Sequence, residues 1–152
     1  MKLYLVQHGE AVEQSENPER PLTAAGRAEV EAVGRLLRSV QLEIPRIEHS
    51  GKARAKETAE ILAEAVAATE LAIRKDLSPN DPVDIVAKSF RNADADLMLV
   101  GHLPFMNKLA SLLVTGDEYA DVVAFQKGAV LCLQREDDAT WRIAWMVVPR
   151  IA

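Results

Sequence analysis

Apolar and polar residues follow two periods along this chain, one typical of strands and one typical of helices. Short apolar runs of strand length recur from the start of the sequence, at residues 2–7, 46–49, 71–74, 96–100, 129–134 and 142–148. Apolar residues at helical spacing occupy the stretches between them, at residues 22–40, 53–67, 83–90 and 105–114. Thr23 has the residue type that favours the N-cap of the first helix.

Strands that alternate with helices predict an α/β fold in three layers, α/β/α, with a mostly parallel central sheet. The strand at 96–100 is too apolar to lie at an edge. The last two strands are joined by a short acidic turn at 136–139, so we expect an antiparallel pair at one edge. In open α/β sheets, ligands bind beyond the carboxyl ends of the strands, which directs attention to the residues that follow each strand.

Composition narrows the class of protein. The 152 residues fit one domain, 1–152. The net charge of −5 gives no basic surface of the kind that binds nucleic acid, and no apolar run approaches the ~18–20 residues of a membrane span. Residues 1–6 have an apolar run too short for a signal peptide, so we expect a cytoplasmic protein. Cys132, the single cysteine, is expected to be a buried structural thiol.

Two of the three histidines follow predicted strands, and each is next to a glycine. His8 comes after the first strand and His102 after the fourth, while Arg54 lies one helical turn beyond the end of the second strand. One such histidine alone is more often an ordinary polar residue at a strand end. If the first and fourth strands are neighbours, however, both imidazoles face one crevice. Pro104 suits the first turn of the next helix, whose free N–H groups favour an anion.

This set of residues is suited to phosphoryl transfer. That reaction needs a nucleophile in line with the leaving group and donors around the equatorial oxygens. A neutral imidazole is nucleophilic at pH 7, so His8 can take the phosphoryl group while Arg54 and His102 bind its oxygens. His49 is interpreted as a strand-end residue. We expect no metal and no cofactor, because the histidines have no HxH or HExxH spacing and an arginine opposes a cation.

Four segments resemble the motifs of a known family, the histidine phosphatase (phosphoglycerate-mutase-like) superfamily. Residues 7–11 resemble its Arg-His-Gly signature, 20–26 its R-P-L-T-x-x-G segment, 50–58 its S-P-x-x-R-A-x-x-T segment, and 101–104 its second-histidine segment. The segments occur in the family's order and span nearly the whole chain. The resemblance implies a phosphoglycerate-mutase-like fold, with His8 as the nucleophile that becomes phosphohistidine. It also implies that Arg20, Arg54 and His102 bind the phosphoryl oxygens; without it, Arg20 reads as a solvated loop residue.

The branch of the family follows from what the chain lacks. Only about forty residues separate Thr58 from Gly101, which leaves no room for the lid insertion of mutases and large acid phosphatases. The chain therefore resembles the short SixA type, the phosphohistidine phosphatases that act on signalling proteins. The expected partner is a phosphorylated protein that carries phosphohistidine, or else a small phosphate ester.

The chain departs from the family pattern at two roles. Gln7 stands where the family has arginine, and losing a charged hydrogen bond costs about 1.5–3 kcal/mol, a ten- to hundredfold loss of rate. The general acid is not assigned by any matching segment. Glu10 is the candidate, with a surface position as the equal alternative, and Asp81 and Glu57 are weaker candidates.

Three hypotheses remain. The first is a metal-independent phosphohistidine phosphatase that works through His8. The second is a phosphatase of small phosphomonoesters. The third is a weakly active or non-catalytic module that only binds phosphorylated partners, because Gln7 has replaced the arginine.

Overall fold

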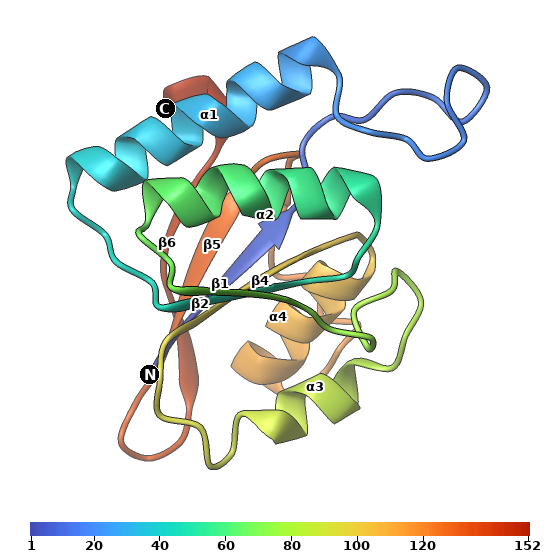
Figure 1. The fold of residues 1–152 in the computed structure, drawn as a ribbon. Helices are drawn as coiled ribbons and strands as arrows, with labels where there is room; N and C mark the ends of the chain where they lie inside the picture. Colours follow the sequence, from blue (N-terminus) through green and yellow to red (C-terminus); the bar gives the residue numbers. More distant parts are fainter.

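Six strands form one sheet in the order β3-β2-β4-β1-β5-β6 in the computed structural model, which describes residues 1–152 (Figure 1). The strands are β1 (Lys2–Gln7), β2 (Arg46–His49), β3 (Glu70–Ile73), β4 (Leu97–Gly101), β5 (Val130–Arg135) and β6 (Trp141–Val147). The helices are α1 (Ala24–Ser39), α2 (Ala53–Ala65), α3 (Val83–Ser89), α4 (Phe105–Thr115) and the short 3₁₀ helix η1 (Pro149–Ile151). Every predicted strand and helix is present, with ends that differ by one or two residues.

The sheet is parallel except at one edge. Strands β3, β2, β4 and β1 run in the same direction, and β5 pairs antiparallel with both β1 and β6. The predicted antiparallel hairpin at an edge is therefore confirmed. Strand β4 lies between β2 and β1 with all five residues buried, as its continuous apolar run predicts.

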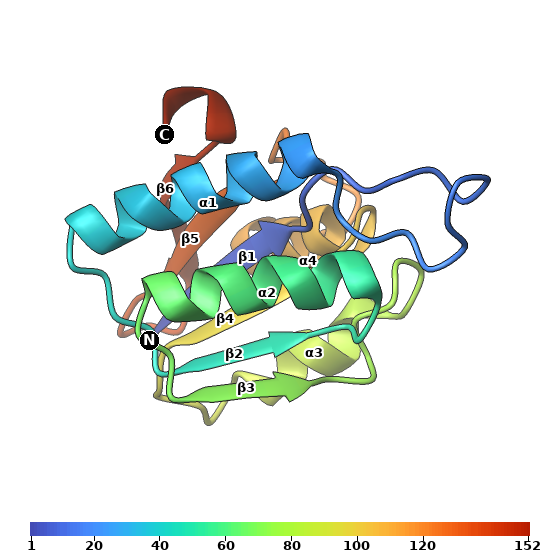
Figure 2. The same ribbon diagram turned by 45° about the horizontal axis from the view of Figure 1, so that its top comes forward.

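Helices cover both faces of the sheet, so the predicted three-layer arrangement is confirmed. Helices α1 and α2 lie on one face, and α3 and α4 lie on the other (Figures 1 and 2). Alternate residues of β1 supply the two cores: Leu3 and Leu5 belong to the cluster that contains Phe105 of α4, whereas Tyr4 and Val6 belong to the cluster on the side of α1 and α2. Burial of this apolar surface is the main driving force for folding.

The start of α1 shows how the sequence specifies a helix end. The Gly26 N–H donates to the Thr23 hydroxyl at 2.9 Å, which confirms Thr23 as the N-cap. Val30, Val33 and Leu37 then turn the apolar face of the helix toward the sheet. None of the four α-helices has the length and apolar character that crossing a membrane requires.

The central thiol is a structural group. Cys132 of β5 is fully buried in the cluster that also holds Tyr4, which is its register partner on β1. Burial raises the pKa of the Cys132 thiol to about 11, so it stays protonated at neutral pH. The expectation of a buried, unreactive cysteine is confirmed.

Candidate active site

Two neighbouring parallel strands bring the two predicted histidines together. Gln7 of β1 lies opposite Gly101 of β4, and the His8 N–H donates to the Gly101 carbonyl at 3.0 Å. The rings of His8 and His102 consequently lie with their centroids 5.0 Å apart. Both side chains are buried, at the carboxyl ends of β1 and β4. Both imidazoles therefore lie at the edge of the sheet where α/β proteins bind ligands, and the region that they share there is called the crevice.

The protonation of His8 is set by the residue that follows it. The Nδ1 atom lies 2.7 Å from the Gly9 carbonyl oxygen, and a carbonyl can only accept a hydrogen bond. The hydrogen of the neutral ring is therefore on Nδ1, and Nε2 keeps its lone pair. The pKa of His8 is lowered to about 4, mainly by burial and to a smaller extent by the charges of Arg54, Lys127 and Arg20, while the Gly9 hydrogen bond acts in the opposite direction. At neutral pH this imidazole is therefore uncharged, which is the state that a nucleophilic histidine requires.

The second histidine is also neutral. Burial is the main cause that lowers the pKa of His102 to about 3, followed by His8 and Arg54. Its Nε2 atom shares a hydrogen bond with the Ser50 hydroxyl at 2.7 Å, while Nδ1 is buried without a protein partner. Ser50 directly follows β2, so three adjacent strand ends contribute to the crevice. One ring nitrogen of His102 is thus oriented by Ser50, and the other has no hydrogen-bond partner in the protein.

Arg54 lies in the first turn of α2 and is coupled to the His8 loop through one hydroxyl. The Thr58 Oγ1 atom donates to the Arg54 carbonyl at 2.7 Å and accepts the Gly9 N–H at 3.0 Å. The Arg54 Nε atom is buried without a protein partner, and burial together with Arg20 lowers the pKa of the guanidinium. The charge of Arg54 reaches both histidines, as the prediction requires.

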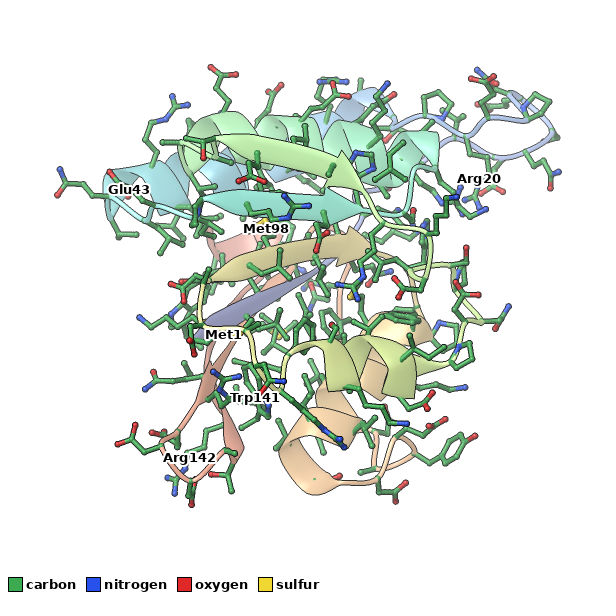
Figure 3. The ribbon with its side chains drawn as sticks, turned by 60° about the horizontal axis from the view of Figure 1, so that its bottom comes forward. Met1, Arg20, Glu43, Met98, Trp141 and Arg142 are labelled. Carbon is green, nitrogen blue, oxygen red and sulfur yellow. The ribbon has the colours of Figure 1, made fainter.

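Arg20 reaches the same crevice from the long loop between β1 and α1. This loop is closed by a bridge between Ala11 and Leu22, and Arg20 Nε donates to the Val12 carbonyl at 3.0 Å. Figure 3 shows Arg20 at the side of the molecule toward which the parallel strands point. Its charge acts on both histidines and on Arg54. The structure therefore groups Arg20 with the site rather than leaving it as a solvated loop residue.

Two glycines allow the β1–α1 loop to lie against α1. A Cβ atom at Gly9 would lie 2.8 Å from the Val30 side chain, and a Cβ atom at Gly26 would clash with the backbone of Glu10. Glycine is thus required at both positions because the loop and α1 approach each other too closely for a side chain, and not because of a role in the reaction. The two residues that follow His8, Gly9 and Glu10, are fixed by these contacts.

Gln7 is buried at the end of β1 and cannot provide the charge of an arginine. Its Oε1 atom is buried without a protein partner. The side chain carries no charge and offers a single amide group instead of a guanidinium fork. The crevice therefore has an uncharged side chain at position 7.

The candidate acids are held by neighbouring backbone and side chains. Glu10 is exposed and accepts the Thr23 hydroxyl at 2.9 Å, and it is absent from the charges that shift the pKa of either histidine. Glu57 accepts the Leu22 N–H at 3.1 Å, and Asp81 accepts the Ser78 N–H at 2.9 Å. The structure gives each of these carboxylates a partner at the N-terminus of α1 or in a flanking loop, and Glu10 makes no hydrogen bond or ion pair with either imidazole.

Two lysines near the crevice were not anticipated from the sequence. Lys127 affects His8 and Lys52 affects His102 through their charges. The signal for Lys127 was a Lys-Gly pair before an apolar strand, which is typical of a turn. His49, by contrast, accepts the Gly51 N–H at 3.1 Å, which agrees with its interpretation as a strand-end residue.

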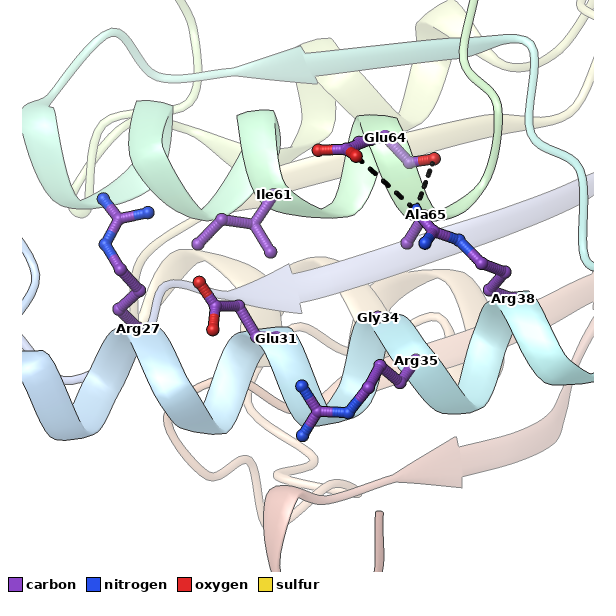
Figure 4. A pocket seen from close by; sticks show the side chains of 8 residues that line it. All are labelled: Arg27, Glu31, Gly34, Arg35, Arg38, Ile61, Glu64 and Ala65. Carbon is purple, nitrogen blue, oxygen red and sulfur yellow. Dashed lines mark hydrogen bonds and ion pairs between the residues drawn. The ribbon is translucent and has the colours of Figure 1, made fainter.

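Two surface pockets lie near or beyond this crevice. One pocket of about 300 Å³ lies between α1 and α2 (Figure 4) and contains neither histidine. Its lining is Arg27, Glu31, Gly34, Arg35, Arg38, Ile61, Glu64 and Ala65. A second pocket of about 330 Å³ adjoins the crevice through Lys127. Its lining is Glu10, Glu29, Gln126, Lys127, Pro149 and Arg150.

Known proteins resemble this chain in sequence and in fold. The sequence model of the histidine phosphatase superfamily (branch 1) matches residues 3–81, just over half of the chain. A curated protein of Picosynechococcus sp., described as uncharacterized, is 29% identical over 143 residues, which cover 85% of this chain and 87% of that protein.

Solved structures show the same architecture over nearly the full length. The protein histidine phosphatase SixA in complex with tungstate has a TM-score of 0.87 and 22% identity, and the match covers 99% of both chains. A SixA structure from Nakamurella multipartitia has a TM-score of 0.79 and 22% identity, over 97% of this chain and 95% of that chain. Phosphoglycerate mutase from Plasmodium falciparum matches with a TM-score of 0.72 and 18% identity, over 95% of this chain and 88% of that chain. The predicted phosphoglycerate-mutase-like fold is confirmed.

Proposed function

The chain belongs to the histidine phosphatase superfamily, branch 1, and we propose that it is a metal-independent phosphatase whose nucleophile is Nε2 of His8. One observation carries this proposal. The Gly9 carbonyl holds the ring hydrogen on Nδ1, and the lowered pKa keeps Nε2 unprotonated at neutral pH. Arg20 and Arg54 supply positive charge beside that atom without a metal ion.

The reaction proceeds in two displacements. The Nε2 lone pair of His8 attacks phosphorus, the bond to the leaving group breaks, and the bonding electrons leave with that group. Water then attacks the phosphorus of phosphohistidine, the P–N bond breaks, and its electrons return to Nε2 while the water releases a proton. The guanidinium groups of Arg20 and Arg54 neutralise the equatorial oxygens in both steps.

His102 acts as a binding group for the phosphoryl oxygens. Its imidazole is neutral at neutral pH, with Nε2 bonded to Ser50 and Nδ1 buried without a protein partner. An entering phosphoryl group places negative charge beside this ring, which favours the protonated form. A protonated His102 has two N–H donors, one for Ser50 and one for the phosphoryl oxygen.

We assign the substrate to phosphohistidine on a partner protein. The chain between Thr58 and Gly101 is used by the end of α2, by β3, α3 and β4, and by their short connections, which leaves little length for a lid insertion. An uncovered site admits a side chain that another protein presents. An imidazole that leaves in its protonated form needs little help from a general acid, which agrees with a Glu10 carboxylate bonded to Thr23.

Gln7 supports one competing function, a module that binds phosphorylated partners without turnover. The family's arginine is absent at this buried position, and the Gln7 amide supplies no charge to the transition state. A module of this kind binds an oxyanion and forms no phosphoenzyme. Small phosphomonoesters form the alternative substrate class and are included in the same assay.

The test is a substrate panel that contains phosphoramidate, a phosphohistidine protein and p-nitrophenyl phosphate. His8→Ala is expected to reduce turnover to the background rate, whereas His49→Asn, the matched control at the third histidine, keeps the wild-type rate. Unchanged turnover in His8→Ala contradicts the mechanism. Wild-type protein that binds phosphate without turnover supports the binding module, and a strong preference for the phosphomonoester replaces the proposed substrate.

A further inference from the structure

A tight turn places one lysine directly beside the end of β1. The Ala129 N–H donates to the Gln126 carbonyl at 2.9 Å, and Gly128 has a φ of +80° at the third position. A positive φ at that position is typical of a type II turn and favours glycine. Lys127 therefore occupies the second position, at the exposed corner of the turn.

The turn is hydrogen-bonded to the two residues that matter most in the crevice. The Gly128 N–H donates to the Gln7 carbonyl at 2.9 Å and lies 3.2 Å from the His8 carbonyl. Strand β5, which begins two residues later, pairs with β1 along its length. The position of Lys127 relative to His8 is thus fixed by backbone bonds on adjacent strands.

The ammonium group of Lys127 is available to a ligand. It makes no ion pair within 4.0 Å, although Glu10 and Glu29 line the same pocket. The positive charge of Lys127 lowers the pKa of His8 less than the charge of Arg54 does and more than the charge of Arg20 does. A lysine is a point charge on a flexible four-carbon stem, so it can follow a phosphoryl group that enters the crevice.

We propose that Lys127 binds the phosphoryl oxygens and supplies, from the turn before β5, the positive charge that Gln7 lacks. This inference rests on the proposed function only in taking an oxyanion as the ligand. The positive charge that the family has at the end of β1 is thus supplied here from the turn that precedes the neighbouring strand, β5. The crevice then holds Arg20, Arg54 and Lys127 around His8.

The test measures oxyanion binding, which does not depend on turnover. Calorimetric titration with tungstate and with inorganic phosphate is carried out on wild type, Lys127→Gln, Lys127→Arg and the control Lys88→Gln. Lys88 is an exposed lysine of α3 that pairs with Asp84. Lys127→Gln is expected to bind both anions about tenfold more weakly. Lys127→Arg and Lys88→Gln are expected to retain the wild-type affinity.

A double variant separates a charge effect from a structural one. Gln7→Arg combined with Lys127→Gln is expected to recover the affinity that Lys127→Gln loses, because the charge returns at the family position. Wild-type affinity in Lys127→Gln, no recovery in the double variant, or no binding of either anion by wild type overturns the inference. If binding depends on Lys127 but no turnover is seen, the inference holds and the proposed phosphatase activity is contradicted. If the protein turns substrate over and Lys127→Gln does not change the rate, the phosphatase activity holds and the inference is contradicted.

Discussion

The Gly9 N–H donates to the hydroxyl of Thr58 at 3.0 Å, and this bond joins the nucleophile loop to α2. The same hydroxyl donates to the Arg54 carbonyl at 2.7 Å. Thr58 is fully buried, and it makes no direct contact with a phosphoryl group in the proposed reaction. We expect this hydroxyl to fix the separation between His8 and Arg54, on which in-line transfer in the proposed reaction depends.

Replacing Thr58 with valine tests this positioning function. The substitution keeps the shape of the side chain and leaves the buried Gly9 N–H unpaired, which costs about 1–3 kcal/mol of unfolding free energy. We expect kcat/KM for phosphoramidate to fall in Thr58→Val. Thr58→Ser keeps the hydroxyl and is expected to recover most of the rate. Equal rates for Thr58→Val and wild type at a temperature where both are folded contradict the assignment.

Restoring the family residue at position 7 should increase activity. Gln7→Arg returns a charged donor worth about 1.5–3 kcal/mol toward a dianionic group; because Lys127 is proposed to supply part of this charge already, kcat/KM is expected to rise about tenfold, at the lower end of that range. Gln7→Leu, a control of similar size without polar atoms, is expected to give no gain. Steady-state kinetics on phosphoramidate and a melting curve for each variant provide the measurement. A folded Gln7→Arg protein with the wild-type kcat/KM would contradict the prediction that a positive charge at position 7 accelerates the reaction.

The sequence was sufficient to predict the strands, the α-helices and their arrangement in three layers. Apolar runs at strand spacing and at helical spacing locate every β-strand and every α-helix, and Thr23 marks the start of α1, because these signals depend on local periodicity and capping. Strand order was not predicted in full: that β1 lies between β4 and β5 follows from tertiary packing. The register that places Gln7 opposite Gly101 was equally beyond the periodic pattern.

The site could be predicted only in part. His8, His102 and Arg54 follow strand ends, so sequence position alone groups them. The position of Lys127 and the hydrogen bond that the Thr23 hydroxyl donates to Glu10 both arise where turns and loops meet in the folded chain. The spacing of residues along the sequence does not reveal those contacts. A residue can therefore be adjacent to the nucleophile in sequence and be bonded elsewhere, as Glu10 is.

The stability of the protein should fall in acid because of His8. The folded-state pKa is lowered to about 4 from an ordinary value of 6.5, so the unfolded chain binds a proton in this interval and the folded chain does not. This contribution is complete above pH 6.5, decreases as the pH falls toward 4, and amounts to about 3 kcal/mol. Urea unfolding of wild type and His8→Gln across this range measures it. The variant is expected to have the flatter profile, and parallel profiles contradict the assigned pKa.

The contact between Gly26 and the backbone of Glu10 should be intolerant of a methyl group. Gly26→Ala places a Cβ atom into that backbone and is expected to destabilise the protein by about 1–3 kcal/mol while displacing the loop that carries His8. Gly34→Ala, in the same helix, brings a methyl group only to 3.1 Å from Ala65 and serves as the matched control. Thermal unfolding of both variants gives the comparison. A Gly26→Ala protein as stable as Gly34→Ala is the contrary result.

The position of the phosphoryl group on the enzyme is the most direct test of the account. After rapid quenching of a reaction with phosphoramidate under alkaline conditions, peptide mapping and ³¹P NMR locate the trapped group. Because Nδ1 of His8 donates to the Gly9 carbonyl, the account predicts phosphorylation of Nε2 of His8, and no phosphoenzyme in His8→Ala. A phosphoryl group on Nδ1 of His8, or on any other residue, would contradict it.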